Sequence, residues 1–423
     1  MRVIIVNYRF FIAGGPERYM FNFMAAAERM GIEVIPFSVQ NPQNKKTAYA
    51  SYFAKPRADA LMFADTKFSL RNLYGIFRAT VWNLDAERRL GKLIRDTKPD
   101  AVYILHEVNH LSPSVIRAVK REGIRVVHRI SDFFMFCARS DFLYENEICE
   151  ACLQGHYKKA IMRRCVKGTG AGTLLRVLAM KLYQCNGVFR DVDLFVTPSA
   201  FTKRKLLEGG VPQNKVVHIP TFIDSRSVIP CYTHDHYFLF LGRMAKQKGT
   251  IYAIKAMSRL KNSNYVLKIT GSLSDTEEDL ELRHAIREYH LEDKIVFTGF
   301  LAGKELDNLI DHAVCIVCPA IWYENMPNTV LEAYAHGKPV VASRIGSLEE
   351  IVENEKTGFL FPPKDADALA NELRKFIEDG TLSGRLGKNA RKKCEEEYNE
   401  AIHMKKVIAC LNSGRTGGRK DTA

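Results

Sequence analysis

The chain has 423 residues, which is enough for two domains of ordinary size. Hydrophobic residues make up 46% of it and charged residues 26%, and this balance excludes a disordered or fibrous chain. The 62 Lys and Arg residues outnumber the 48 Asp and Glu residues, and the net charge of +14 favours an anionic partner such as nucleic acid, an acidic membrane surface or a phosphorylated substrate.

The positive charge is concentrated in one segment. Residues 151–190 contain no Asp or Glu. They hold the basic residues Lys158, Lys159, Arg163, Arg164, Lys167, Arg176, Lys181 and Arg190. Either a solvated face or a binding surface explains such a run. A smaller basic group lies in the Gly-rich tail 412–423, which we expect to be flexible.

No targeting segment is expected. The apolar run at residues 3–6 is too short for a signal peptide, and no segment approaches the roughly 20 apolar residues of a transmembrane helix. We therefore expect a cytoplasmic protein. In a reducing compartment, ten cysteines are more typical of buried side chains, metal ligands or reactive thiols than of disulfides.

Strand and helix patterns alternate through the first half of the chain. Strands are predicted at 3–7, 32–39, 101–105, 124–130, 194–197 and 215–219. Helices are predicted at 17–30, 85–97, 112–122 and from 198 onward, whereas residues 40–80 have no clear pattern. The order indicates a mostly parallel sheet with helices on both faces. The pattern stops at 221–236, which indicates a linker.

A second series of the same kind follows the linker. Its strands are predicted at 237–241, 265–270, 295–298, 314–317 and 340–342, and its helices at 249–260, 276–290, 304–312 and 328–337. The sequence thus predicts an α/β protein in which two doubly wound domains, 1–220 and 237–395, face each other across a cleft. Ligands of such sheets bind beyond the carboxyl ends of the strands. A last helix at 396–411 is expected to pack back on the first domain.

Two segments of the second domain suit a phosphorylated ligand. Arg243 and Lys248 lie in the loop after its first strand, where two cations precede a helix start. Glu324 lies in a later loop, and Glu332 lies one turn into the helix that follows it. Glu332 can accept two hydrogen bonds from a diol such as a ribose. The alternative for each Glu is an exposed side chain that interacts with the helix dipole.

The helix that carries Glu332 opens with free backbone donors. Its first amides, those of Asn328, Thr329 and Val330, have no partner within the helix and can donate to a phosphate.

Five segments of the second half, in this order and spacing, resemble the second domain of family 4 glycosyltransferases, which are retaining, nucleotide-sugar-dependent enzymes of the GT-B fold. These segments are 240–249, 296–300, 324–342, 346–352 and 357–360. The resemblance covers roughly residues 237–395.

The resemblance implies a role for each matching residue. Arg243 and Lys248 would hold the donor pyrophosphate, Glu332 the ribose hydroxyls, and Glu324 the donor sugar near its reacting carbon. Gly346 would belong to the loop that faces the nucleotide. The other residues expected to bind the donor are Asn325, Met326, Pro327, Asn328, Thr329 and Val330.

The first domain matches the family more loosely. Gly14 and Gly15 resemble its glycine loop, whose bare backbone can approach a phosphate or an acceptor, although a simple tight turn is the alternative. Residues 99–106 and 126–137 resemble two further segments that end in functional side chains. Ser131 stands where the family usually has His, so we expect Asp132 or His106 to share the role of that catalytic residue.

The implied chemistry leaves a nucleoside diphosphate. Two cations and helix-start amides can stabilise its charge, so no metal cofactor is expected for catalysis. The Asp191-Val192-Asp193 segment looks like the metal motif of another glycosyltransferase fold, but it leads into a strand rather than out of one into a cleft. Retention implies either a double displacement or a same-face substitution. The sequence offers no clear nucleophile, and the family is usually assigned the second route.

Four cysteines lie in an insert at 137–190. Cys137, Cys149, Cys152 and Cys165 follow the spacing C-x11-C-x2-C-x12-C. Four thiolates suit a structural zinc ion or an iron–sulfur cluster, whereas free cysteines are the alternative. A zinc ion would pin the insert beside the acceptor cleft.

The same insert continues into a predicted helix at 173–183 with one apolar face and cationic flanks. Such a helix suits an anionic membrane surface, or else packs on the domain core.

The leading hypothesis is a glycosyltransferase at the inner face of the membrane. It would use a UDP- or GDP-sugar and a lipid-linked or polysaccharide acceptor in the synthesis of a cell-surface glycan. A zinc-bearing nucleic-acid-binding protein is one alternative, but no known module or aromatic and basic stacking surface supports a nucleic acid as partner. A sugar-nucleotide epimerase of the same fold is another.

Overall fold

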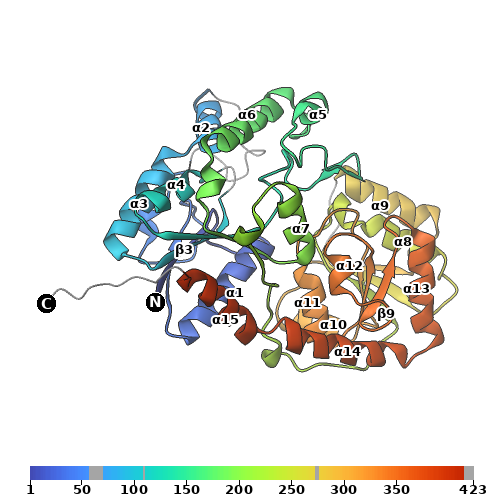
Figure 1. Cartoon of the computed structure of the whole chain (residues 1–423). Helices are drawn as coiled ribbons and strands as arrows, with labels where there is room; N and C mark the ends of the chain where they lie inside the picture. Colours follow the sequence, from blue (N-terminus) through green and yellow to red (C-terminus); the bar gives the residue numbers. More distant parts are fainter. Residues whose placement is uncertain (57–69, 108–109, 272–275, 414–423) are drawn as a thin grey trace.

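The computed structural model describes residues 1–56, 70–107, 110–271 and 276–413. These residues form two α/β domains that lie side by side, each built on a six-stranded parallel sheet (Figure 1). The prediction of two doubly wound domains is confirmed.

The first sheet is buried on both faces. Val3, Ile4, Ile5 and Val6 are fully buried, as expected for a parallel strand covered by helices on both sides. In sheet order, its strands are β2 (Glu33–Phe37), β1 (Arg2–Asn7), β3 (Ala101–His106), β4 (Arg125–Arg129), β7 (Leu194–Thr197) and β8 (Val216–His218).

Two helices of the first domain begin at side-chain caps. The Asn83 side chain accepts from the amides of Asp85 and Ala86, and Ser199 caps a later helix in the same way. The helices are α1 (Gly15–Arg29), α2 (Leu70–Val81), α3 (Leu84–Thr97), α4 (Ser114–Arg121) and α7 (Ala200–Glu208). Of these, α2 lies in the segment 40–80 for which the sequence made no prediction.

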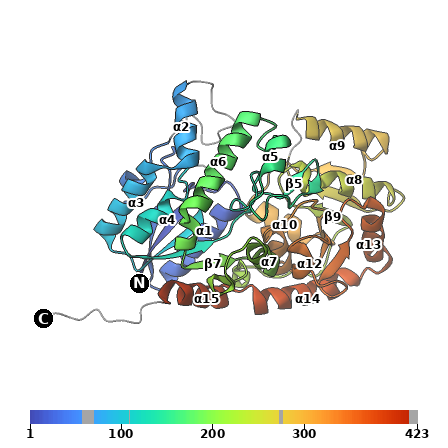
Figure 2. The same cartoon turned by 45° about the horizontal axis from the view of Figure 1, so that its top comes forward.

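The insert between β4 and β7 is partly irregular. A short hairpin of β5 (Leu143–Tyr144) and β6 (Glu147–Ile148) precedes α5 (Lys158–Met162) and α6 (Gly170–Asn186). The last helix is longer than the predicted 173–183. Helix α6 packs against α2 and α5, and all three lie together at one side of the molecule, at the top of the view in Figure 2.

The second sheet repeats the design. In sheet order, its strands are β11 (Ile295–Phe297), β10 (Val266–Ile269), β9 (Tyr237–Phe240), β12 (Ile316–Cys318), β13 (Val340–Ser343) and β14 (Gly358–Phe361). Its helices are α8 (Thr250–Ser258), α9 (Glu277–Glu288), α10 (Lys304–Asp311), α11 (Asn328–Ala335), α12 (Leu348–Ile351), α13 (Ala366–Glu378) and α14 (Leu382–Glu397).

The strand order reverses at one point in each sheet. In the first sheet the chain runs outward from β1 to β2 and then returns to the other side of β1 with β3. In the second sheet it runs outward from β9 through β11 and returns with β12. A crevice opens at such a point, beyond the carboxyl ends of the strands. The loops after β1, β3, β9 and β12 are therefore placed to hold a ligand.

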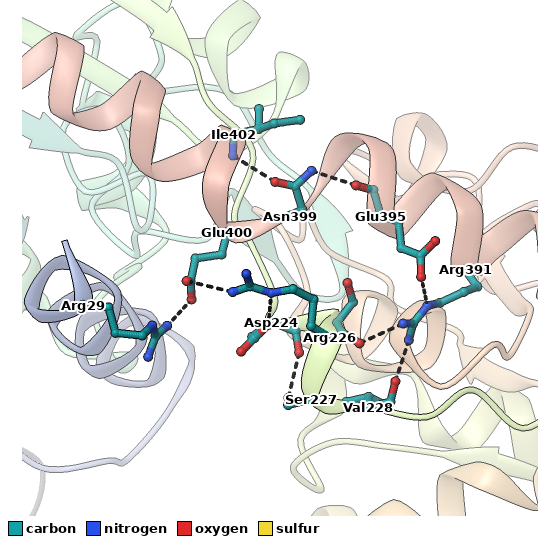
Figure 3. Close-up of polar contacts among 11 residues, drawn as sticks. Arg29, Asp224, Arg226, Ser227, Val228, Arg391, Glu395, Asn399, Glu400 and Ile402 are labelled. Carbon is teal, nitrogen blue, oxygen red and sulfur yellow. Dashed lines mark hydrogen bonds and ion pairs between the residues drawn. The ribbon is translucent and has the colours of Figure 1, made fainter.

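The chain crosses between the domains twice, once before β9 and once after α14. Figure 3 shows the polar contacts that join the two crossings. Arg391 on α14 donates to the carbonyl oxygens of Ser225 at 2.8 Å and Val228 at 3.0 Å. Glu400, at the start of α15 (Glu400–Asn412), pairs with both Arg29 of α1 and Arg226.

Helix α15 belongs to the core of the first domain. It packs on α1, β3 and β4, and Met404, Val407 and Leu411 are buried among side chains of that domain. Within the described parts of the chain, no helix combines the length and the apolar character needed to cross a bilayer.

Candidate active site

The second domain contributes two loops that meet beside β9 and β12. Lys248, in the loop after β9, places its Nζ 2.6 Å from Oε1 of Glu324, in the loop after β12. The indole N–H of Trp322 donates to the same oxygen at 2.8 Å. Gly249 has a φ of +72°, and a Cβ there would lie 1.8 Å from the carbonyl oxygen of Pro319. Only glycine therefore lets the two loops approach this closely.

A third segment supports the Glu324 loop. The hydroxyl of Ser347 donates to the backbone carbonyl of Glu324 at 2.7 Å. Gly346 has a φ of +57° and packs against Tyr323, because a Cβ at Gly346 would lie only 3.2 Å from the ring of that tyrosine. The loop that the resemblance assigns to the nucleotide thus also positions Glu324.

Helix α11 starts where the sequence predicts. Pro327 is its N-cap, and Asn328, Thr329 and Val330 are its first residues. Val330 is buried, whereas Asn328 and Thr329 are partly exposed. The amide of Val330 donates to the carbonyl oxygen of Pro327 at 3.1 Å, so the prediction that this amide is free is wrong. The amides of Asn328 and Thr329 are the helix-start donors of this turn that are left for a phosphate.

Glu332, one turn into α11, has a partner on the other domain. It forms an ion pair with Arg18 of α1. A Cβ at Gly15 would lie 3.4 Å from the side-chain nitrogen of Asn328, so the starts of α1 and α11 face each other. Arg243 is exposed, and its charge reaches the hydroxyl of Tyr8 in the first domain.

Asn325 joins the two domains. Its Nδ2 donates to the carbonyl of Ile130 at 3.2 Å, and its Oδ1 accepts from the hydroxyl of Thr202. Met326 packs against the core of the second domain, and Pro327 is buried. In this arrangement Asn325 holds the first domain, and the side chains of Met326 and Pro327 contribute packing.

The domains also touch at the start of α7. The carboxylate of Glu350 accepts from the amides of Ala200 at 2.7 Å and Phe201 at 2.8 Å. A carboxylate at a helix start is favourable because the free amides and the helix dipole both stabilise it. The contact helps to hold the two halves of the site at a fixed spacing.

The first domain contributes a histidine–carboxylate pair. His106 ends β3, and its Nε2 lies 3.1 Å from Oδ2 of Asp132, just after β4. Burial opposes the protonated imidazole, but the hydrogen bond and charge of Asp132 outweigh it and raise the pKa of His106. Burial likewise favours the neutral acid of Asp132, but His106 outweighs it and lowers the pKa of Asp132. Ser131 donates its hydroxyl to the carbonyl of Leu105 at 2.7 Å.

A pocket opens beside this pair. A second histidine–carboxylate pair, His128 with Glu107 at 2.9 Å, is buried next to it. Burial alone would raise the pKa of Glu107, but the charge and hydrogen bond of His128 lower it. The pocket is lined by Leu105, His106, Glu107, His128, Ile130, Ser131, Asp132, Phe134 and Met135.

The sequence did not predict three residues that lie near the pocket: Tyr8, Arg9 and Glu17. The ring of Tyr8 meets His106 edge-on with centroids 4.9 Å apart, and burial raises the pKa of its hydroxyl to about 12. Glu17 is only 2% exposed, and its carboxylate lies 3.9 Å from Arg9. Glu17 follows the two glycines of its loop closely, but an acidic residue in a first helical turn has an ordinary explanation in the helix dipole.

The four cysteines of the insert are free thiols. Burial raises the pKa of Cys152 to about 12, and the charges of Cys137, Cys165 and Cys149 add to the effect, so the four lie near one another. Over the described ranges, however, no three His, Cys, Asp or Glu side chains are arranged to hold a metal ion. The zinc site remains a prediction that metal analysis of the purified protein would test.

Asp191 and Asp193 both interact with basic side chains of the first domain. Asp193 accepts from Lys120 at 2.9 Å and from the amide of Val126 at 2.8 Å, and Asp191 pairs with Arg117 at 3.4 Å. These contacts fit the interpretation that Asp191 and Asp193 are not a metal motif.

Helix α6 has two apolar faces. One faces the domain and contains Val177, Met180 and the buried Arg176, whose guanidinium lies 3.6 Å from the centre of the Phe134 ring. Arg176 is therefore not part of an exposed basic surface, although it is one of the basic residues counted in the segment 151–190. The other face exposes Leu174, Leu178 and Leu182, at 46%, 56% and 41%. The exposed basic residues nearby are Lys158, Lys159, Arg164, Lys167 and Lys181.

Two family models match this chain. The model described as Glycosyltransferase Family 4 matches residues 13–227, and the model described as Glycosyl transferases group 1 matches residues 223–393.

The relatives match this chain over only about half of its length. The glycosyltransferase MJ1607 of Methanocaldococcus jannaschii is 33% identical over 42% of this chain and 45% of its own length. The amylovoran biosynthesis glycosyltransferase AmsK of Erwinia amylovora is 29% identical over 53% of this chain and 57% of its own length. The chain thus spans about half the length of these relatives.

The fold has known counterparts over its whole length. The structure of Anabaena Alr3699/HepE in complex with UDP and glucose matches 98% of this chain and 100% of its own, with a TM-score of 0.68 and 14% identity. This likeness confirms the predicted GT-B arrangement of the two domains.

Proposed function

The chain belongs to glycosyltransferase family 4, and from this premise we propose that it transfers a sugar from a nucleotide-sugar donor to an acceptor with retention of configuration. The observation that carries the proposal is the Lys248–Glu324 pair at the crevice of the second sheet, with the His106–Asp132 pair at the crevice of the first. HepE, which has this fold, was solved with UDP and glucose, so uridine diphosphate sugars are the first donors to test.

The proposed roles follow from charge and position. Arg243, Lys248 and the first amides of α11 would bind the diphosphate, and Glu332 the ribose. As the bond between the sugar carbon and the diphosphate oxygen breaks, charge develops on that oxygen, and positioned cations stabilise it. Glu324 would contact the sugar. The acceptor hydroxyl would enter from the side of His106 and Asp132 and bond to the carbon on the face that the diphosphate leaves, and its proton would pass to the departing diphosphate oxygen.

A donor screen tests the reaction. Release of nucleoside diphosphate from UDP- and GDP-sugars is measured with and without candidate acceptors, and NMR of the product gives its anomeric configuration. We expect release that depends on an acceptor and a product with the donor's configuration. Conversion of the donor without an acceptor would favour an epimerase instead, and an inverted product would contradict retention.

We further propose that the acceptor is a lipid-linked or polysaccharide precursor of a cell-surface glycan, reached at the inner face of the membrane. The named role of AmsK in amylovoran biosynthesis supports this substrate class. The exposed leucine row of α6 and the basic residues around it also support it, because apolar side chains flanked by cations suit an anionic bilayer surface.

Vesicle binding tests the membrane step. We expect the protein to sediment with vesicles that contain anionic lipid, and Leu178→Glu to weaken this binding. Phe300→Glu is the matched control, because Phe300 is 88% exposed but belongs to the second domain and not to α6. Equal loss in both variants, or binding to neutral vesicles alone, would contradict the proposed surface.

A further inference from the structure

One ion pair joins the two domains at the proposed donor site. A guanidinium nitrogen of Arg18, on α1, contacts Oε1 of Glu332, on α11, although the two residues are 314 positions apart. The side chain of Arg18 is 48% exposed and that of Glu332 is 22% exposed. The carboxylate expected to hold a ribose is thus already paired with a cation from the other domain.

The surroundings of this pair are suited to an anion. The starts of α1 and α11 face each other, with Gly15 close to Asn328, so the amides that remain free at the two helix starts lie on facing elements. The nearby carboxylates are both engaged by cations, Glu324 by Lys248 and Glu332 by Arg18. An anion that binds Lys248 or Arg18 in this space must therefore compete with one of these carboxylates.

We propose that Arg18 is a donor-binding residue that exchanges its partner Glu332 for the diphosphate of the nucleotide sugar. The inference rests on the proposed function, because a ribose that takes the oxygens of Glu332 displaces Arg18. The ribose and its diphosphate are adjacent in the donor, so the displaced guanidinium stands next to the phosphates. A guanidinium binds phosphate oxygens in pairs, and its planar fork suits them as well as it suits a carboxylate.

This exchange of partners predicts a different binding pattern from an ion pair that only holds the two domains together. For a ligand with phosphates, Arg18 loses one anionic partner and gains another. For a ligand with a ribose and no phosphate, Arg18 loses its partner and gains nothing. Removal of the Arg18 side chain should therefore weaken the binding of a nucleoside diphosphate. It should leave the binding of a nucleoside unchanged or make it tighter.

Calorimetric binding of UDP and uridine, or of GDP and guanosine if the protein prefers guanine, tests this inference. Arg18→Ala should lower the affinity for the nucleoside diphosphate about 10-fold or more, consistent with the loss of a charge-assisted hydrogen bond. Its affinity for the nucleoside should equal or exceed that of the wild type. Arg18→Lys should recover part of the diphosphate affinity.

Arg29→Ala is the matched control. Arg29 is on the same helix and also pairs with a carboxylate, Glu400, but at the opposite end from the site, and its loss should leave both affinities unchanged. If Arg18→Ala lowers the affinity for the nucleoside and for the diphosphate equally, Arg18 only holds the two domains together and the inference is wrong. Unchanged affinity for both ligands would also overturn it. If wild type binds neither nucleotide, the proposed function itself fails, and this inference fails with it.

Discussion

Lys248 and Glu324, 76 positions apart in the chain, place Nζ and Oε1 2.6 Å from each other, and their side chains are only 21% and 10% exposed. The resemblance assigns the lysine to the donor's diphosphate and the glutamate to its sugar. A diphosphate that binds Lys248 competes with Glu324, and a released Glu324 can then turn toward the sugar. Under the proposed function, the pair would couple the two ends of the donor site.

Lys248→Ala should weaken binding of a nucleoside diphosphate by about 10- to 100-fold, since hydrogen bonds to charged groups contribute roughly 1.5–3 kcal/mol. Lys246→Ala is the control, because Lys246 lies in the same turn but is half exposed and pairs with Glu281 at 3.8 Å. Calorimetry should find its affinity unchanged. A comparable loss in both variants would mean that a general positive field, rather than a contact from Lys248, binds the diphosphate.

The elements that carry Glu324 and Glu332 could be predicted because their signals are local. Buried parallel strands form apolar runs, and Pro327 followed by Asn328 marks a helix start. The partner of Glu332 could not be predicted, because nothing near Arg18 in the sequence specifies a contact 314 positions away. Helix α2 was missed for a related reason. It packs on α6 of the insert, and such tertiary contacts supply most of a helix's stability.

Gly249 should tolerate no side chain. A Cβ there would lie 1.8 Å from the carbonyl oxygen of Pro319, which leads into the Glu324 loop. Gly249→Ala should therefore lower the free energy of unfolding and also weaken nucleotide binding.

Gly299→Ala separates the clash from the backbone conformation. Gly299 has a φ of +75°, close to the +72° of Gly249, but a Cβ there meets nothing within 4 Å. Its substitution should cost only about 1–2 kcal/mol, the penalty for a left-handed residue, and leave binding intact. Urea unfolding and calorimetry on both variants measure the difference. Equal effects would show that Pro319 moves aside without consequence.

Asp132→Asn should lower the pKa of His106, because Asp132 is what holds it above the ordinary value of 6.5. NMR titration of the imidazole, identified by its absence in His106→Gln, measures the change. An unchanged titration in Asp132→Asn would mean that other groups set the pKa of His106.

The same pair makes stability depend on pH in two directions. The contribution of His106 is fully present below pH 6.5, its unfolded pKa, and is lost as pH rises through the raised folded pKa. The contribution of Asp132 is present above its ordinary value of 3.8 and is lost as pH falls through its lowered folded pKa. The unfolding free energy of wild type should exceed that of Asp132→Asn most between these limits. A difference that grows above pH 7 would contradict this sign.

Arg391 should be the most costly polar side chain to remove from the domain crossing shown in Figure 3. Its side chain is only 11% exposed, and it donates to the carbonyls of Ser225, Val228 and Ala335 as well as to Glu395. Arg391→Ala leaves these acceptors without their donor, so we expect a loss of about 2–4 kcal/mol in unfolding free energy.

Lys392→Ala is the control for Arg391, because Lys392 is the next residue on α14, is 73% exposed and pairs loosely with Glu396 at 3.9 Å. A surface pair of this kind contributes less than about 1 kcal/mol, so its loss should hardly move the urea midpoint. Arg391→Lys should rescue little, since a single ammonium cannot replace a planar fork that reaches several carbonyls. If Arg391→Ala unfolds at the same urea concentration as Lys392→Ala, the guanidinium is not what ties the two crossings together, and packing of α15 on the first domain must hold them instead.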